Sequence, residues 1–201
     1  MEEYPLTELL IDPRSVAIVL IDVQPFFLER AHGNMQPVLQ RLEQLLIVAP
    51  VVKVPVIATL EKPVAKKGKL PDLLDNQFPA DGRVFEKSTY SIVGQFEVMS
   101  TLGQLKRRQL VIAGGETDVC VLQSVLDLID KRFSIFIVED AIYSSATDVS
   151  AARGRMQQAG ATMISYKSLF YELIRTEASN AWSRLDALSG QGGFVPPETI
   201  T

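Results

Sequence analysis

Short apolar runs alternate along the chain with segments whose apolar residues recur at helical spacing. The runs predict strands, because buried parallel strands read as nearly continuous hydrophobic stretches, and they fall at residues 16–21, 54–60, 83–86, 110–113, 134–138 and 162–165. The periodic segments predict helices at residues 38–49, 96–105, 121–129, 148–159 and 169–174. Pro50 is expected to end the first of these helices, and Gly160 the fourth.

This alternation indicates a three-layer α/β fold, with a mostly parallel sheet flanked by helices on both faces. We assign the domain to residues 1–188, because no Gly- or Ser-rich linker divides them. The polar stretch 63–71 is expected to be a loop. Residues 189–201, SGQGGFVPPETIT, are rich in Gly and Pro and are expected to form a flexible tail or an arm that orders on another subunit.

The composition of the chain excludes several classes of binding partner. Hydrophobic residues make up 47% of the 201 positions, which excludes intrinsic disorder. The net charge of −4 provides no positive excess for a phosphate backbone, so nucleic acid is not an expected partner. The longest apolar stretch, residues 45–52, falls well short of the roughly 20 residues that span a bilayer, so no membrane partner is expected. The acidic N-terminus, unlike a signal peptide, and the single cysteine, which permits no internal disulfide, favour a cytoplasmic protein.

Three reactive side chains stand where predicted strands end. Asp22 closes the first strand, Lys87 follows the third, and Cys120 follows the fourth after the loop GGETDV, at the start of a helix that Thr117 or Asp118 would cap. Taken singly, each has an ordinary explanation as a cap, an exposed edge residue or a core residue. Because ligands bind outside the carboxyl ends of parallel strands, we expect the three in one crevice.

The chemistry of such a trio is that of an activated thiol. An ammonium and a helix N-terminus are expected to favour the thiolate of Cys120. Asp22 would accept the thiol proton and return it to a leaving group. His32, the single histidine, lies in the loop-like segment AHGN and is expected at the surface or at a pocket rim.

Several motifs resemble one known family. The segments SVAIVLIDVQPFF, FEKSTYSIVG and LVIAGGETDVCVLQSVLDL are similar to the three signature regions of the isochorismatase-like cysteine hydrolases, and VEDAIYSS and MQQAGATMIS to the downstream segments. The resemblance covers residues 15–188 and implies a Rossmann-like, six-stranded sheet with a catalytic triad of Asp22, Lys87 and Cys120. It also implies a cis peptide between Gly115 and Glu116, with the amides of Glu116 and Cys120 forming an oxyanion hole.

Two departures from the family pattern restrict the chemistry. Nicotinamidases of the family hold a metal with an Asp-x-His segment and further histidines after the second strand, whereas this chain reads TLEKPVAKKGK there. We therefore expect no catalytic metal and no cofactor. Isochorismatases that cleave a vinyl ether can dispense with the thiol, so the retained Cys120 favours C–N bond hydrolysis.

The leading hypothesis is a hydrolase that cleaves a C–N bond of a small amide, ureide or carbamoyl compound through a thioester on Cys120. The alternatives are a vinyl ether hydrolase of the isochorismatase type and a non-hydrolytic member that binds a ligand or senses redox state. A homo-oligomer, dimer or tetramer, is expected, because the apolar candidate helix with Trp182, Leu185 and Leu188 precedes the FVPP segment. The residues expected to line the substrate pocket are Gln24, Phe27, Tyr90 and Thr117.

Overall fold

A single parallel sheet forms the centre of the molecule. The computed structural model describes residues 9–189 and 193–200, so the predictions for the N-terminal eight residues and for residues 190–192 and 201 of the tail lie outside the described residues. The six strands are ordered β3-β2-β1-β4-β5-β6, and every neighbouring pair is parallel. Their bounds are β1 Val16–Ile21, β2 Val56–Glu61, β3 Arg83–Lys87, β4 Gln109–Gly115, β5 Ser134–Tyr143 and β6 Thr162–Ile164.

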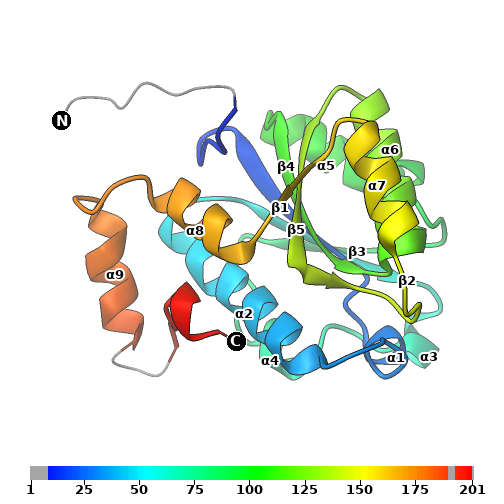
Figure 1. The fold of residues 1–201 in the computed structure, drawn as a ribbon, viewed down its shortest axis with the longest axis horizontal. Helices are drawn as coiled ribbons and strands as arrows, with labels where there is room; N and C mark the ends of the chain where they lie inside the picture. The colour runs from blue at the N-terminus through cyan, green and yellow to red at the C-terminus, as the bar shows by residue number, and fades with distance from the viewer. Residues whose placement is uncertain (1–8, 190–192, 201) are drawn as a thin grey trace.

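Helices cover both faces of this sheet, which confirms the predicted three-layer α/β fold (Figure 1). On one face lie α2 (Met35–Val51), α8 (Tyr166–Ile174) and α9 (Asn180–Ser189). On the other lie α5 (Phe96–Leu105), α6 (Leu122–Asp130) and α7 (Ser150–Gln158). Shorter elements complete the chain: α1 Pro25–Leu28, α3 Val64–Lys67, α4 Asp72–Asp75, η1 Ile92–Gly94, the π-helical turn η2 Thr117–Val121 and η3 Pro197–Thr199.

The central strand shows why the apolar runs are continuous. All six residues of β1 are fully buried, and alternate side chains enter the two cores because the side-chain period of a strand is two. Val16, Ile18 and Leu20 join the core under α2 and α8. The intervening residues of the strand join the core under α5 and α6.

The chain order reverses at β1, which pairs with β2 on one side and with β4 on the other. In parallel α/β sheets such a switch point opens a crevice at the carboxyl ends of the strands. The topology therefore brings together the residues that follow β1, β2, β3 and β4.

The sequence predictions for three short segments differ from the structure. Pro50 lies inside the last turn of α2, and the helix ends one residue later, at Val51. The stretch 63–71, expected to be a loop, contains the helical turn α3, because four residues carry no apolar periodicity to detect. Neither Thr117 nor Asp118 caps a helix: the chain enters α6 through the π-helical turn η2, and both side chains bond to the end of β5 and the residue that follows it.

The described part of the tail packs on its own chain. Phe194 stacks on Phe170 of α8 with ring centroids 5.6 Å apart, and the Gln44 side chain of α2 bonds to the backbone of Gly193 and Val195. Leu185 of α9 is fully buried in the same core. Within the described ranges, no helix is both long and apolar enough to cross a membrane.

Candidate active site

The site begins with the residue that ends β1. Asp22 is fully buried and adopts a left-handed conformation with φ of 49°, which is uncommon outside glycine. Three hydrogen bonds to the backbone of Asp22 hold this conformation. Its N–H donates to Thr59 O at 3.1 Å, and its carbonyl accepts from the Tyr143 hydroxyl at 3.0 Å and from Gln24 N–H at 2.9 Å. The carboxylate therefore projects from a backbone that is fixed on both sides.

Both oxygens of this carboxylate have partners. Oδ1 accepts a hydrogen bond from the Thr59 hydroxyl at 2.9 Å, and Oδ2 lies 2.6 Å from Nζ of Lys87. Burial raises the pKa of Asp22, and the Lys87 charge and the hydrogen bonds from Lys87 and Thr59 act against it.

Lys87 ends β3, and its ammonium is fully buried. Nζ donates to the carbonyls of Thr89 at 3.0 Å and Tyr90 at 3.1 Å, and it lies 3.5 Å from Sγ of Cys120. Burial alone would lower the pKa of Lys87, but the surrounding negative charge, that of Asp22 first, outweighs it and raises the pKa. The surroundings of Lys87 therefore favour its charged ammonium form in the centre of the site.

Two glycines at the end of β4, Gly114 and Gly115, let this strand approach β1 and β5 closely. A Cβ on Gly114, whose φ is +108°, would lie 2.2 Å from the carbonyl oxygen of Ile21, and one on Gly115 would lie 2.4 Å from the Tyr143 ring. Only glycine fits at these two positions. The peptide between Gly115 and Glu116 is cis, and the Glu116 carboxylate accepts a hydrogen bond from Ser145 N–H at 3.0 Å.

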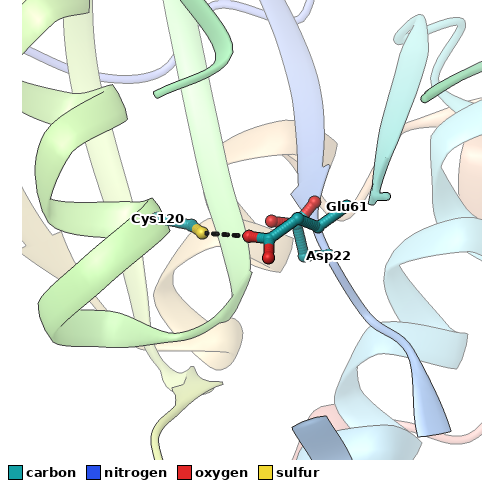
Figure 2. Close-up of side chains that lie close together, drawn as sticks. All are labelled: Asp22, Glu61 and Cys120. Carbon is teal, nitrogen blue, oxygen red and sulfur yellow. Dashed lines mark hydrogen bonds between the residues drawn. The ribbon is translucent and has the colours of Figure 1, made fainter. Parts of the chain in front are cut away.

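Cys120 lies in the turn η2, and the structure brings it together with Asp22 and Lys87. Its side chain is 2% exposed and lies in the core under α5 and α6. The thiol donates a hydrogen bond to Oε2 of Glu61 at 3.2 Å (Figure 2). Sulfur therefore lies between a carboxylate and an ammonium.

The surroundings of Cys120 act in the direction opposite to the expected stabilisation of the thiolate. Burial, followed by the negative charge of Asp22, raises the pKa of the Cys120 thiol, and the hydrogen bond to Glu61 raises it further. The nearby Lys87 charge lowers the pKa but does not offset these effects. These surroundings of Cys120 therefore favour the neutral thiol over the thiolate.

Glu61 is the site residue that the sequence interpretation missed. It ends β2 and pairs in register with Lys87 on β3, so the two side chains emerge side by side. Oε2 lies 3.7 Å from Nζ of Lys87, and Oε1 accepts a hydrogen bond from Lys67 of α3. The sequence does carry a signal, because Glu61 directly follows the apolar run of residues 54–60 as Asp22 follows that of residues 16–21.

Asp22, Glu61 and Cys120 have the donor types of a cation site, and one ligand atom from each lies within 4.8 Å of the others. Lys87 lies among them, with Nζ 2.6 Å from Asp22, 3.5 Å from Cys120 and 3.7 Å from Glu61. A metal ion would have to share this space with a buried ammonium, so the donor set does not fit a divalent cation.

The residues expected to line the pocket lie around this centre in different ways. Gln24 is fully buried, and its amide bonds to the backbone of Glu61 and Gly68. Phe27 is buried in α1, and the Thr117 hydroxyl donates to the Tyr143 carbonyl at 3.0 Å. Tyr90 is 56% exposed. His32 is exposed, as expected, and its backbone N–H donates to the Ser144 carbonyl at 2.7 Å.

Comparison with known proteins gives consistent matches. The family model for the isochorismatase domain matches residues 16–168. The chain is 30% identical over 179 residues to the secreted isochorismatase effector Isc1 of Phytophthora sojae, an alignment that covers 88% of this chain and 85% of that protein.

Solved structures share the fold. The ycaC gene product of Escherichia coli, described as an octameric hydrolase of unknown specificity, superposes with a TM-score of 0.82 at 24% identity, over 92% of each chain. The MAR1 ribonuclease from Caenorhabditis elegans superposes with a TM-score of 0.81 at 23% identity, over 93% of this chain and 95% of that one. At these identities the likeness shows the fold and not the substrate.

Proposed function

Because the chain belongs to the isochorismatase family, whose members are hydrolases, we propose that it is a cysteine hydrolase that cleaves the C–N bond of a small amide, ureide or carbamoyl compound. The observation that carries this proposal is the environment of Cys120. Its sulfur lies 3.2 Å from a Glu61 carboxylate oxygen and 3.5 Å from the Lys87 ammonium, next to the buried Asp22. A nucleophile with a proton acceptor and a cation within reach is the arrangement that covalent catalysis requires.

The reaction proceeds through a thioester. The thiol gives its proton to a carboxylate of the site as sulfur attacks the carbonyl carbon, and the family resemblance assigns this carboxylate to Asp22. The amides of Glu116 and Cys120 are the proposed donors to the tetrahedral oxyanion. Collapse of the intermediate releases ammonia or an amine, which takes up the proton. Water, activated by the same carboxylate, then hydrolyses the thioester and restores the thiol.

Lys87 stabilises each charged stage of this cycle. It faces the developing thiolate at 3.5 Å and holds the Asp22 carboxylate at 2.6 Å, while two backbone carbonyls fix its own position. A cation that is already desolvated and oriented needs no rearrangement when negative charge appears on sulfur.

The thiol distinguishes this proposal from its alternatives. Vinyl ether hydrolysis needs no nucleophilic sulfur, whereas here Cys120 contacts both charged partners. Redox sensing favours an accessible thiol with a low pKa, whereas the Cys120 side chain is 2% exposed and burial raises its pKa. The low exposure argues against a sensor, and the contacts of sulfur with Glu61 and Lys87 are those of a nucleophile.

The four expected pocket residues divide into those that form the wall of the pocket and one that contacts the substrate. Gln24 and Thr117 bond to backbone with their side chains, so they shape the pocket wall together with the buried Phe27. Tyr90 has the most exposed surface of the four and follows Lys87 closely, so it is the residue best placed to contact a substrate.

The proposal includes a homo-oligomeric assembly and a cytoplasmic location. Val84, Tyr90 and Phe96, 43%, 56% and 79% exposed, come from the edge strand β3 and the segment that follows it, and a homo-oligomer would cover such residues. A cytoplasmic location accords with a chain whose single cysteine forms no internal disulfide.

The decisive experiment measures turnover of a panel of small amides, ureides and carbamoyl compounds by release of ammonia or amine. Intact-mass spectrometry in parallel should find an acyl adduct on Cys120 that is absent from Cys120→Ala. An enol ether and an RNA oligomer serve as competing substrates. Cleavage of either without any C–N cleavage, or turnover that survives in Cys120→Ala, would refute the proposal.

A further inference from the structure

Sulfur is faced by two carboxylates, and the proposed mechanism uses only one of them. The Cys120 thiol donates a hydrogen bond to Oε2 of Glu61 at 3.2 Å (Figure 2). The Asp22 carboxylate is also within hydrogen-bonding reach of the thiol, and it is the group to which the mechanism assigns the proton. The second carboxylate, that of Glu61, takes no part in the proposed proton transfers.

Proton transfer from sulfur to Asp22 removes the donor that Oε2 of Glu61 has in the resting site. The other oxygen, Oε1, accepts from Lys67 of α3, and Oε2 lies 3.7 Å from Nζ of Lys87, which is too far for a hydrogen bond. Only 12% of the Glu61 side chain is exposed, so solvent has little access to it. A buried charged oxygen without a donor is unstable, so the later stages of the cycle require a new donor at Oε2.

We propose that the substrate supplies this donor, and that Glu61 is a specificity-determining residue whose Oε2 accepts a hydrogen bond from an N–H of the leaving nitrogen. The inference rests on the proposed C–N hydrolysis and narrows its substrate class. The leaving group is ammonia or a primary amine, so the scissile nitrogen of the amide, ureide or carbamoyl compound carries at least one hydrogen. Esters, enol ethers and N,N-disubstituted amides lack this N–H and are rejected. Glu61 thus joins the Asp-Lys-Cys trio as a fourth charged group.

The groups around sulfur direct the leaving nitrogen toward Glu61. A carbonyl carbon that bonds to sulfur brings its oxygen and its nitrogen among the groups that surround the thiol. The proposed oxyanion donors, the amides of Glu116 and Cys120, take the oxygen. The nitrogen is left to the side of the two carboxylates that face sulfur. There it can receive the proton from Asp22 and keep an N–H directed at Glu61.

Glu61 is held in place for recognition at three points. Its backbone N–H donates to the Gln24 side chain at 2.7 Å, its Oε1 accepts from Lys67, and the pairing of β2 with β3 aligns it with Lys87. The Lys67 ammonium is itself held by a cation–π contact, 5.3 Å from the centroid of the Phe27 ring. A carboxylate that is fixed before binding loses little conformational entropy when the substrate arrives.

The charge of Glu61 determines which substrate atoms it attracts. Burial alone would raise the pKa of Glu61, but hydrogen bonds from Lys67 and Cys120 and the Lys87 charge outweigh it and lower the pKa. Its surroundings therefore favour the carboxylate, which only accepts hydrogen bonds. Oε2 attracts an N–H and repels the lone pairs of an ester or ether oxygen. A leaving nitrogen that gains a proton becomes more positive, and the carboxylate then stabilises it further.

The proton transfers remain those of the proposed mechanism. The S–H bond breaks as sulfur bonds to the carbonyl carbon, and the proton moves to Asp22. As the C–N bond breaks, that proton passes to nitrogen, which leaves as ammonia or a primary amine. Water takes its place, donates one O–H to Oε2 of Glu61 and gives its other proton to Asp22 as oxygen adds to the thioester. The proton returns to sulfur as the C–S bond breaks, and Glu61 gains no proton at any stage.

The test compares an amide with its own ester in the wild-type protein, Glu61→Gln and Glu86→Gln. The substrates are the fastest compound of the panel and the ester in which an O-methyl group replaces its leaving nitrogen, so both form the same thioester. Gln keeps the size of Glu61, but its amide donates as well as accepts, so it no longer rejects an ester oxygen. Glu86 lies next to Lys87 on β3, is exposed and pairs only loosely with Lys62, at 3.9 Å, so it is the matched control.

The quantity measured is the ratio of kcat/KM for the amide to kcat/KM for the ester. For Glu61→Gln we expect this ratio to fall about 100-fold, because the amide loses a hydrogen bond to a charged acceptor and the ester loses a repulsion. Glu86→Gln should keep the wild-type ratio. The ratio separates recognition from structural damage, because a distorted site or a thiol with a changed pKa affects both substrates alike.

Three outcomes would overturn the proposal. A ratio in Glu61→Gln within about threefold of wild type would show that Glu61 does not distinguish the two leaving groups. An equal fall in Glu86→Gln would assign the effect to the general charge of the surface. If Glu61→Gln does not fold, Glu61→Asp keeps the charge but withdraws the carboxylate by one methylene, and an unchanged ratio in that variant would also exclude the role.

Failure of the proposed function is recognised separately, because alkylation of Cys120 requires no turnover. Iodoacetamide and methyl iodoacetate bring the same reactive carbon to sulfur but differ in an amide NH2 against an O-methyl group. If the wild-type protein cleaves no compound of the panel, the ratio of the two alkylation rates, divided by that of a free thiol in solution, decides. A preference for iodoacetamide that falls about tenfold in Glu61→Gln supports recognition by Glu61, and equal ratios in the two proteins refute it.

Discussion

Removal of the buried ammonium tests how the site is stabilised, and Lys87→Met is the sharpest perturbation. Lys87 and Asp22 are both fully buried and 2.6 Å apart. Met fills a similar volume but leaves the Asp22 charge without its cation and the carbonyls of Thr89 and Tyr90 without their donor. Breaking a buried pair by removing one partner costs about 3–5 kcal/mol.

For a chain of this length that loss corresponds to a decrease in Tm of roughly 6–20 °C, at about 2–4 °C per kcal/mol. The loss should depend on pH. Without Lys87 the pKa of Asp22 in the folded state, which burial already raises, rises further above its value in the unfolded chain. A raised pKa contributes stability at low pH that is lost as pH rises, so the deficit of Lys87→Met should be smaller at about pH 5 than at about pH 8.

Thermal and urea denaturation at several pH values provide the measurement, with Lys62→Met as the control. The Lys62–Glu86 pair is about half exposed and 3.9 Å apart, so its loss should cost at most about 1 kcal/mol at any pH. The double variant Asp22→Asn/Lys87→Met, which removes both charges, should recover part of the lost stability. A Lys87→Met protein that melts with the wild type, or whose deficit is the same at both pH values, would refute the reasoning.

Three further predictions concern the nucleophile, the metal requirement and the assembly. Cys120→Ala should abolish C–N cleavage in the amine assay and lower the free energy of unfolding by about 1 kcal/mol, because the side chain is buried in a core; residual activity near wild type would contradict it. EDTA should leave the rate unchanged, since the buried Lys87 ammonium lies where a cation would bind, whereas loss of activity restored by added metal would contradict the metal-free mechanism. Light scattering at micromolar concentration should show a dimer or larger species, because Tyr90 and Phe96 expose aromatic surface, and a strictly monomeric mass would exclude this.

Much of the fold follows from the sequence pattern alone. The run VAIVLI is apolar at every position because β1 is buried on both faces, and this continuity distinguishes a central parallel strand from an edge strand. Because parallel strands all end at one edge of the sheet, the positions of Asp22, Lys87 and Cys120 along the chain were enough to predict that they meet.

The tertiary structure decided the electrostatics and the fourth charged group. The balance between burial, which raises the pKa of the Cys120 thiol, and the Lys87 charge, which lowers it, depends on distances and exposure that no local pattern encodes. Glu61 enters the site because β2 extends one residue beyond its apolar run and pairs in register with β3. A sequence states that a charged residue follows a strand, but only the packing of three strands against one turn determines which charges face the sulfur.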